Sequence, residues 1–496
     1  MKYLYSTLLL IIYTSGFSQV STSAEDILQS LKIQNELIEN SIVKNLEFKN
    51  IGPSVMSGRV TDLEVNPNNP SEFYVAYASG GLWHTVNNGN TFSPIMDNSD
   101  TQNIGDFDID WSTRLIIVGT GENNSSRSSY AGVGILKSND NGKTWKNIGL
   151  NDSHHIGKIV INPNNPNEIV VAVLGHLYSK NKERGIFKTI DGGVTWENTL
   201  YIDESTGIID LDISPNNFKI QFASSWQKSR KAWDFKGNGE KSGIYKSVDS
   251  GKTWNLISTQ KSGFPTGNGV GRIGLAVFDS KTLYAVVDNQ FRRPKSKAST
   301  EKTDLSKNYF ESISKERFLK IDDLKLDKFL TTNSFPKKYN STKIKELVKN
   351  DLIKPSDLKL YLEDANTVMF ETPIIGAQVY RSDDGGLNWT LKNSYYLDRL
   401  YNTYGYYFGK IHVSPVNKDN IYIYGVPFIK SNDGGVTYKS IDYPNVHVDH
   451  HDLWINPKNP KHLINGNDGG VNISYDDGEN WLKLNQPSVG QFYTIN

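Results

Sequence analysis

The eight residues from Ser138 to Trp145 read SNDNGKTW, and six other stretches of the chain repeat their pattern. The further copies begin at Thr85, Thr189, Ser247, Ser382, Ser431 and Ser474. Their consensus is S/T-x-D-x-G-x-T-W, and the copy at Thr85 is the most degenerate. Seven copies of one short pattern indicate a repeat fold, in which each repeat is one supersecondary unit.

Each position of the repeat has a structural use. We expect the Asp carboxylate to accept hydrogen bonds from backbone N–H groups two and three residues on, and the Gly to take the positive φ of a tight hairpin. The Ser or Thr hydroxyl can tie the entering strand to the turn, and the Trp can cover it with about 150–250 Å² of aromatic surface. The pattern therefore predicts turns, in preference to seven metal or ligand sites.

A second element lies upstream of the boxes. It reads NPNNP at residues 66–70 and again at 162–166, each time between two apolar runs such as 60–65 and 73–77. One unit is then a four-stranded meander of about 45–55 residues, the size of a propeller blade. The chain is thus predicted to be all-β, a seven-bladed antiparallel β-propeller over residues 45–490 with a helical insertion.

The insertion accounts for the one irregular spacing. Successive boxes start 43 to 58 residues apart, except for the 135 residues that separate Ser247 from Ser382. Residues 291–365 lack strand alternation, have helical spacing, and carry 18 Lys plus Arg against 12 Asp plus Glu. We interpret them as a basic helical excursion from the fifth blade, either a solvated decoration or a lid or docking arm over one mouth of the channel.

These boxes resemble the Asp-box, or bacterial neuraminidase, repeat. The wider pattern, with GHLY at 175–178, HHDLW at 450–454 and NGNDGG at 465–470, is similar to secreted bacterial propellers of the sortilin-type and xyloglucanase-like glycosyl hydrolase kind. The resemblance covers nearly everything from residue 45 onward and implies the fold. Relatives with these boxes include sialidases, xyloglucan hydrolases, assembly factors and peptide receptors, so the function stays open.

The two ends of the chain carry separate predictions. Residues 1–18 have a positive Lys2 and an apolar run from Tyr3 to Tyr13, which indicates a signal peptide cleaved before Gln19; an uncleaved anchor is the alternative. Residues 19–44 are expected to be polar and helical. Residues 487–496 match the start of a blade and are interpreted as the possible start of a truncated second propeller, against a natural one-propeller form.

Composition excludes several functional classes. The chain has 54 Lys plus Arg against 54 Asp plus Glu, a balance that argues against nucleic-acid binding. It has no cysteine, which removes disulfides, thiolate metal sites and cysteine nucleophiles. No stretch after the first twenty residues is apolar enough to span a bilayer. We therefore expect a secreted, periplasmic or cell-surface protein with no cofactor and no membrane span in the mature chain.

The inner strands align into one column of mostly charged residues. Through the seven blades the column reads Asp62, Asp106, Lys158, Asp210, Gly274, Lys410 and Asp452. These residues either hold the blades in register or form a channel-mouth site for a polar ligand. Asp62 and Asp452 are weak candidates for a catalytic carboxylate pair, which a glycosidase needs at about 5–9 Å separation.

A ligand site is predicted where the inner strands begin. Arg59, His155, Arg272, His450 and His451 lie there, at or next to one strand level. Cationic and titratable groups at this level indicate an anionic sugar or a peptide carboxylate, with a charge that changes between about pH 5 and 8. No metal site is predicted, because the run from His447 to Asp452 places too few ligands on either strand face.

Two functions remain after this reasoning. The first is a secreted scaffold that recognises a polysaccharide or an extended peptide at a channel mouth, with a second propeller or another protein as a possible partner. The alternative is a glycoside hydrolase acting on a polysaccharide with paired carboxylates. Whether the chain is an enzyme stays uncertain.

Overall fold

The structure is a computed structural model that describes most of the chain. The described residues are 21–46, 52–53, 58–294, 305–306, 308–333, 335–336, 338–362, 374–401, 404–442 and 445–490. The predicted signal peptide and residues 491–496, part of the predicted start of a second propeller, lie outside them.

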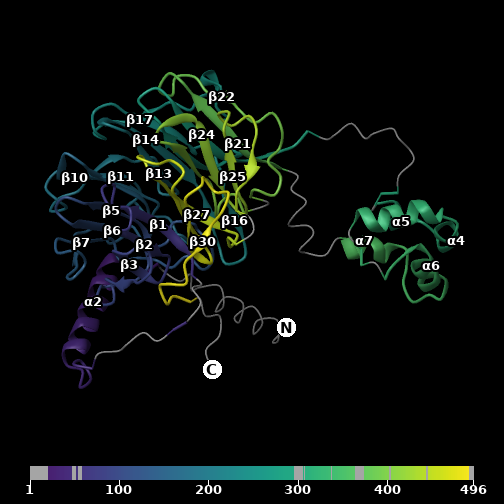
Figure 1. Cartoon of the computed structure of the whole chain (residues 1–496), viewed down its shortest axis with the longest axis horizontal. Coiled ribbons are helices and arrows are strands. Elements are labelled where there is room, and N and C mark those ends of the chain that lie inside the picture. Colours follow the sequence, from purple (N-terminus) through teal and green to yellow (C-terminus); the bar gives the residue numbers. More distant parts are fainter. Residues whose placement is uncertain are drawn as a thin grey trace, which may run out of the picture.

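Seven four-stranded antiparallel sheets follow one another along the chain, and each sheet is one blade (Figure 1). The first three blades contain β1 (Val60–Val65), β2 (Phe73–Tyr77), β3 (Gly81–Thr85) and β4 (Ser93–Pro94); β5 (Ile104–Asp110), β6 (Leu115–Thr120), β7 (Ile135–Ser138) and β8 (Lys146–Asn147); and β9 (Ile156–Asn162), β10 (Asn165–Val173), β11 (Gly185–Thr189) and β12 (Glu197–Leu200). The fourth and fifth contain β13 (Thr206–Ser214), β14 (Asn217–Gln227), β17 (Gly243–Ser247) and β18 (Asn255–Leu256); and β19 (Val270–Val277), β20 (Leu283–Arg292), β21 (Ile374–Ser382) and β22 (Thr390–Leu391). The last two contain β23 (Lys410–Ser414), β24 (Asn417–Tyr424), β25 (Phe428–Ser431) and β26 (Lys439–Ser440); and β27 (His450–Ile455), β28 (Leu463–Asn467), β29 (Gly470–Ser474) and β30 (Leu482–Lys483). A small hairpin, β15 (Ser229–Arg230) and β16 (Phe235–Lys236), extends the fourth blade.

The seven blades close into a ring. The innermost strand of each blade lies beside that of the next, and β27 of the last blade contacts β1 of the first. Val60 and Leu63 of β1 share one buried hydrophobic cluster with Ile464 and Ile473 of the seventh blade, which seals the closing interface. The predicted seven-bladed propeller is confirmed.

The Asp boxes form the expected turns with one difference in register. In the third blade Asp191 accepts hydrogen bonds from the backbone N–H groups of Val194 and Thr195, at 3.0 and 2.9 Å. These donors lie three and four residues on, where we expected two and three. The reason is that two consecutive residues, Gly192 and Gly193, both take positive φ, 71° and 92°, before the chain turns back.

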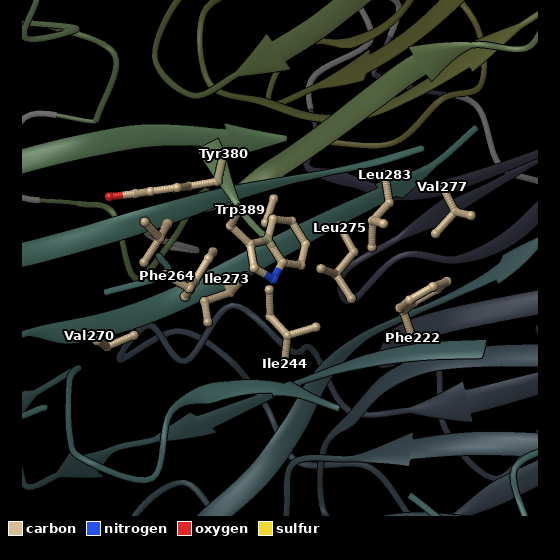
Figure 2. Packing of buried hydrophobic residues seen from close by; sticks show 12 residues of the cluster. Phe222, Ile244, Phe264, Val270, Ile273, Leu275, Val277, Leu283, Tyr380 and Trp389 are labelled. Carbon is tan, nitrogen blue, oxygen red and sulfur yellow. The ribbon is translucent and has the colours of Figure 1, made fainter. Parts of the chain in front are cut away.

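The box tryptophans connect consecutive blades. The indole N–H of Trp145 donates to the carbonyl of Ile95 at 2.7 Å, and that of Trp196 donates to Ile148 at 2.8 Å, each in the connection that follows the previous blade's outer strand. Between the fourth and fifth blades, Figure 2 shows the indole of Trp389 among Phe264, Ile244 and Leu275. Fully burying such a large apolar side chain contributes about 1.5–3 kcal/mol.

Helices occur outside the blades. They are α2 (Ala24–Glu39), the 3₁₀ turn η1 (Gln260–Ser262), α3 (Tyr309–Ser312), α4 (Lys315–Leu319), α5 (Asp323–Thr332), α6 (Ser341–Lys349) and α7 (Ser356–Leu362). Helices α3 to α7 lie between β20 and β21, so the predicted helical insertion is confirmed, and Figure 1 draws them as a separate group. They have a hydrophobic core of their own, which includes Phe310, Phe318, Phe329 and Ile344.

Helix α2 precedes the first blade. Ser23 caps it through a reciprocal pair of bonds with Asp26, and none of its residues is fully buried. Among the described residues no helix combines the length and the apolar character needed to cross a bilayer.

Candidate functional site

The propeller has two unlike faces. Because neighbouring strands are antiparallel, the connection from second to third strand and the connection to the next blade both lie where the inner strands begin. We call this side the loop face; it carries the long connections at 121–134, 174–184 and 228–242 and the helical insertion. The opposite side, with the Pro-Asn turns and the Asp boxes, is the box face.

The charged column of the inner strands holds adjacent blades together. All seven positions occupy the same register in their blades, opposite Ala76, Gly119, Ala172, Ser224, Val286, Tyr424 and Gly466 of the second strands. The column aspartate of one blade accepts a hydrogen bond from a backbone N–H of the next blade. The donor is the residue that directly follows the column position there. Asp62 accepts from Phe107 at 3.0 Å, and Asp452 accepts from Leu63 at 2.9 Å.

The two lysines of the column complete an ion-pair network. The Nζ atom of Lys158 lies 2.8 Å from Asp106 and 3.5 Å from Asp62, and that of Lys410 lies 3.5 Å from Asp452. Burial lowers the pKa of Lys158, but the charges of Asp106 and Asp62 outweigh it and hold the pKa above its ordinary value. Asp62 and Asp452, the weak catalytic candidates, are therefore buried parts of this network, 1% and 6% exposed.

A turn of the second blade fills the channel at the loop face. Glu122, Asn123 and Asn124 follow β6 and are all at least 96% buried. The side-chain amide of Asn123 donates to the carbonyls of Gly105 and Gly157, at 3.1 and 2.9 Å. The oxygen of the Asn124 side chain accepts from Arg272 of the fifth blade at 3.0 Å. Sequence reasoning missed this turn, whose signal is the run of polar residues at 122–126.

Besides Arg272, two more of the predicted ligand residues contact this turn. Arg59 forms a two-point ion pair with Glu122, and the ring nitrogen Nδ1 of His155 lies 2.8 Å from the Glu122 carbonyl oxygen. Burial, followed by the charge of Lys228, lowers the pKa of His155 to about 3. His155 therefore stays neutral between pH 5 and 8, where we expected it to change charge.

The other three residues surround one small cavity. Arg272, His450 and His451 line about 10 Å³ of space, which holds one water molecule at most. Nδ1 of His450 bonds the side chain of Asn465 at 2.8 Å, and Nε2 of His451 bonds Asp468 at 2.9 Å. Arg59 lines a different pocket, of about 220 Å³, together with Tyr130. The five residues thus gather around the mouth but do not line one common cavity among those described.

Larger cavities lie on the box side of this mouth. One, of about 220 Å³, is lined by Lys158, Asp212, Lys410 and His412 inside the channel. Another, of about 550 Å³, is lined by Asp108 and Trp111 near the ends of the inner strands. Burial raises the pKa of Asp212 to about 7 and that of Asp108 to about 6. The open part of the channel is thus polar and lies toward the box face.

Further cations gather on the loop face of the third and fourth blades. Lys228 is 6% exposed, lies 5.8 Å from the ring of Trp226, and has no carboxylate partner among the described residues. Burial lowers its pKa well below the ordinary value, and the charges of Arg184 and Arg230 lower it further. Sequence reasoning did not single out this group, because its members come from separate connections.

The chain resembles a known family in part of its sequence and several solved structures in its fold. A family model described as sortilin, neurotensin receptor 3, matches residues 134–360, which is less than half of the chain. The Asp boxes, the seven four-stranded sheets and this match all indicate the same repeat fold. The chain is a seven-bladed β-propeller whose blades carry the Asp-box pattern. Among curated proteins, none matches it.

Solved structures support the same fold. The GH74 xyloglucanase from Xanthomonas campestris is 12% identical, with a TM-score of 0.51 over 86% of this chain and 53% of that one. An ancestral GH74 enzyme is 14% identical, with a TM-score of 0.50 over 87% of this chain and 47% of that one. The chain thus spans about half the length of these enzymes. YCF48 bound to D1 peptide is 11% identical over 85% of this chain and 94% of that one, with a TM-score of 0.45.

Proposed function

We propose that this protein is a secreted binding scaffold that holds a polysaccharide or an extended peptide on the loop face, across the mouth of the channel. The observation that carries the proposal is a set of large aromatic side chains exposed on the loop-face connections. They are Trp233 (82% exposed), Tyr130 (60%), Tyr178 (53%), Tyr396 (42%) and Phe291 (39%). Aromatic faces stack on sugar rings and pack against peptide side chains.

These five side chains are at least 39% exposed, whereas many other aromatic rings of the described residues are buried. Trp233 lies between β15 and β16, at the tip of a hairpin that projects from the fourth blade. Tyr130 lies in the connection of the second blade that fills the channel mouth, and it lines the same pocket as Arg59. The ligand would therefore contact the aromatics first and have Arg59, His155, Arg272, His450 and His451 beneath it.

Cations of the same face support an anionic group on the ligand. Lys228 has no carboxylate partner among the described residues, and Arg184 and Arg230 lie near enough to lower its pKa. A carboxylate of a uronic acid or of a peptide terminus would pair with the Lys228 ammonium and favour its charged form. We include Lys228 in the proposed site for that reason.

The catalytic alternative has weaker support. A glycosidase needs two carboxyl groups that reach the scissile bond from opposite sides. Asp62 and Asp452 each accept a backbone N–H from the next blade and are buried inside the ring. The likeness to GH74 enzymes is a likeness of fold, so we keep hydrolysis as an outcome of the test.

The test is a glycan and peptide array screened with the purified chain, followed by titration of each hit. We expect Trp233→Ala and Tyr178→Ala to weaken binding by about fivefold or more, since ring stacking on one aromatic side chain, as for nucleic-acid bases, is worth about 1–3 kcal/mol. Tyr475→Ala is the matched control, because Tyr475 is 52% exposed but lies in a box on the opposite face. Equal loss in the control would contradict a site on the loop face.

A reducing-sugar assay on the same polysaccharides distinguishes a binding scaffold from a glycoside hydrolase. Sugar release that disappears in Asp62→Asn or Asp452→Asn would replace the scaffold proposal by a hydrolase.

Export is tested by mass spectrometry of the mature protein, whose first residue we expect near Gln19. An intact Met1 on the protein from the soluble cell fraction would contradict export.

A further inference from the structure

Three potential metal ligands from two loop-face connections meet beside the third blade. Asp152 and His154 lie between β8 and β9, and His176 lies between β10 and β11. Each offers one ligand atom, and these three atoms all lie within 4.8 Å of one another. The two imidazole rings are stacked, with 3.6 Å between their centroids and 19° between their planes. No sequence motif joins the three residues.

The hydrogen bonds around the cluster leave one ring nitrogen without a partner. Nε2 of His154 is buried and has no hydrogen-bond partner of normal geometry, and the backbone of Thr22 interacts with the same side chain. Nε2 of His176 lies 2.9 Å from Oδ1 of Asp152. A buried nitrogen without a partner costs free energy unless something else binds it. The ring of His154 lies beside the carboxylate of Asp152 and the imidazole of His176. The backbone of His154 also takes a positive φ of 55°, which is uncommon outside glycine.

Other side chains hold the ligands in place as they do around metal ions. Nδ1 of His176 bonds the hydroxyl of Ser179 at 2.7 Å, and Asn181 donates to the other carboxylate oxygen of Asp152 at 3.2 Å. Bonds of this kind orient the ligand atoms in known metal sites.

We propose that Asp152, His154 and His176 form a binding site for a divalent transition-metal ion, with Zn²⁺ as the best-suited ion. Two imidazoles and one carboxylate suit zinc and its neighbours better than calcium or magnesium, which favour oxygen ligands. Three protein ligands leave a fourth position for water or another ligand. Ligand atoms around tetrahedral zinc lie about 3.3 Å apart, so binding requires the stacked imidazoles to rotate until their lone pairs converge on the ion. This site goes beyond the proposed function and does not depend on it.

The experiment uses the full chain without a histidine tag, treated with chelator and then dialysed. Isothermal titration with Zn²⁺ should give one bound ion per chain. Titration with Co²⁺ should give visible absorption bands of a low-symmetry nitrogen and oxygen site. We expect His176→Ala and Asp152→Asn to lower the affinity at least tenfold. Asp152→Asn is the milder change, because an amide keeps the size of the carboxylate and its bond to His176.

The control is His447→Ala, which removes an exposed histidine of the seventh blade. It should leave the affinity and the stoichiometry unchanged. Thermal unfolding of every variant in EDTA separates loss of the ligand from loss of the fold. The proposal is overturned if the folded parent binds no stoichiometric ion, if both ligand variants bind as the parent does, or if the control loses binding to the same extent. The contact of His176 with Asp152 would then be only a structural hydrogen bond.

Discussion

Arg59 and Glu122 form a two-point ion pair at the mouth of the propeller channel, with 2.6 Å between Nε and Oε1 and 2.9 Å between Nη2 and Oε2. Arg59 directly precedes the inner strand of the first blade, and Glu122 belongs to the turn of the second blade that fills the mouth. The side chains are 9% and 1% exposed. This pair therefore joins the start of the first blade to the turn that fills the channel mouth.

Replacement of Glu122 should destabilise the protein strongly. Glu122→Gln leaves the guanidinium of Arg59 buried without its counter-charge, and breaking a buried ion pair in this way costs about 3–5 kcal/mol. The measurement is the free energy of unfolding in denaturant. The control is Glu479→Gln, whose ion pair with Lys439 is exposed and should contribute about 0–1 kcal/mol. Equal effects of the two changes would contradict a structural role for the Arg59–Glu122 pair.

The column acids should behave as structural residues. Asp62→Ala removes the acceptor of the Phe107 N–H, and an unsatisfied buried donor costs about 1–3 kcal/mol. Thermal and denaturant unfolding should therefore show a clear loss of stability. Asp97→Ala, at an exposed aspartate, is the control and should change stability by less than about 0.5 kcal/mol. A variant of Asp62 as stable as the parent would argue that the column does not hold the blades in register.

Glu183 should make stability depend on pH. Burial, with a contribution from the charge of Asp152, raises the pKa of Glu183 to about 7 against an ordinary value near 4.5. Between these two pH values the folded state binds more protons than the unfolded state, so stability falls as the pH rises. Glu183→Gln removes this contribution. In EDTA we expect the variant to gain stability relative to the parent from about pH 4.5 to pH 7.

The measurement for Glu183 is the unfolding free energy at a series of pH values, taken as the difference between parent and variant. Oε2 of Glu183 has no hydrogen-bond partner among the described residues, so the amide is expected to fit without losing a bond. A difference that does not change with pH would show that the carboxyl group titrates near its ordinary value.

The helical insertion should be removable. Arg292 of β20 pairs with Ile374 of β21, so the two ends of the insertion lie side by side. Replacing residues 295–373 by a turn of about four or five residues should leave the propeller folded, because hairpin loops of that length are common. Circular dichroism should lose most of its helical signal, with α2 remaining, and the melting temperature should change by only a few degrees. Residues 305–362 alone should fold as a helical unit around their own core.

Removal of the helical insertion has two outcomes that would contradict a dispensable decoration. Loss of the cooperative transition of the propeller on removal of the insertion would mean that contacts of the helices stabilise the blades. The same deletion tests whether the insertion takes part in binding. A deletion variant that folds but loses its array hits would identify the insertion as a docking arm.

The blade count and the positions of the turns were predictable because the Asp box is a local structure. The hydroxyl of Ser138 donates to the carboxylate of Asp140 and accepts from the backbone N–H of Gly142, all within a few residues. Apolar alternation places the strands between the boxes, so seven boxes mean seven blades. The insertion was visible for the same reason, as a helical stretch that interrupts the repeat between Ser247 and Ser382.

What lies in the channel mouth was decided only by tertiary structure. The sequence determined that Arg59, Arg272 and the histidines begin their inner strands, but not what they contact there. Arg272 bonds Asn124, 148 residues away, and Leu63 bonds Asp452, 389 residues away. Such partners meet only when the ring closes, and no local periodicity encodes which polar side chain occupies the space that closure leaves. The sequence therefore determined the frame of this protein, and ring closure decided which charged groups are paired inside it.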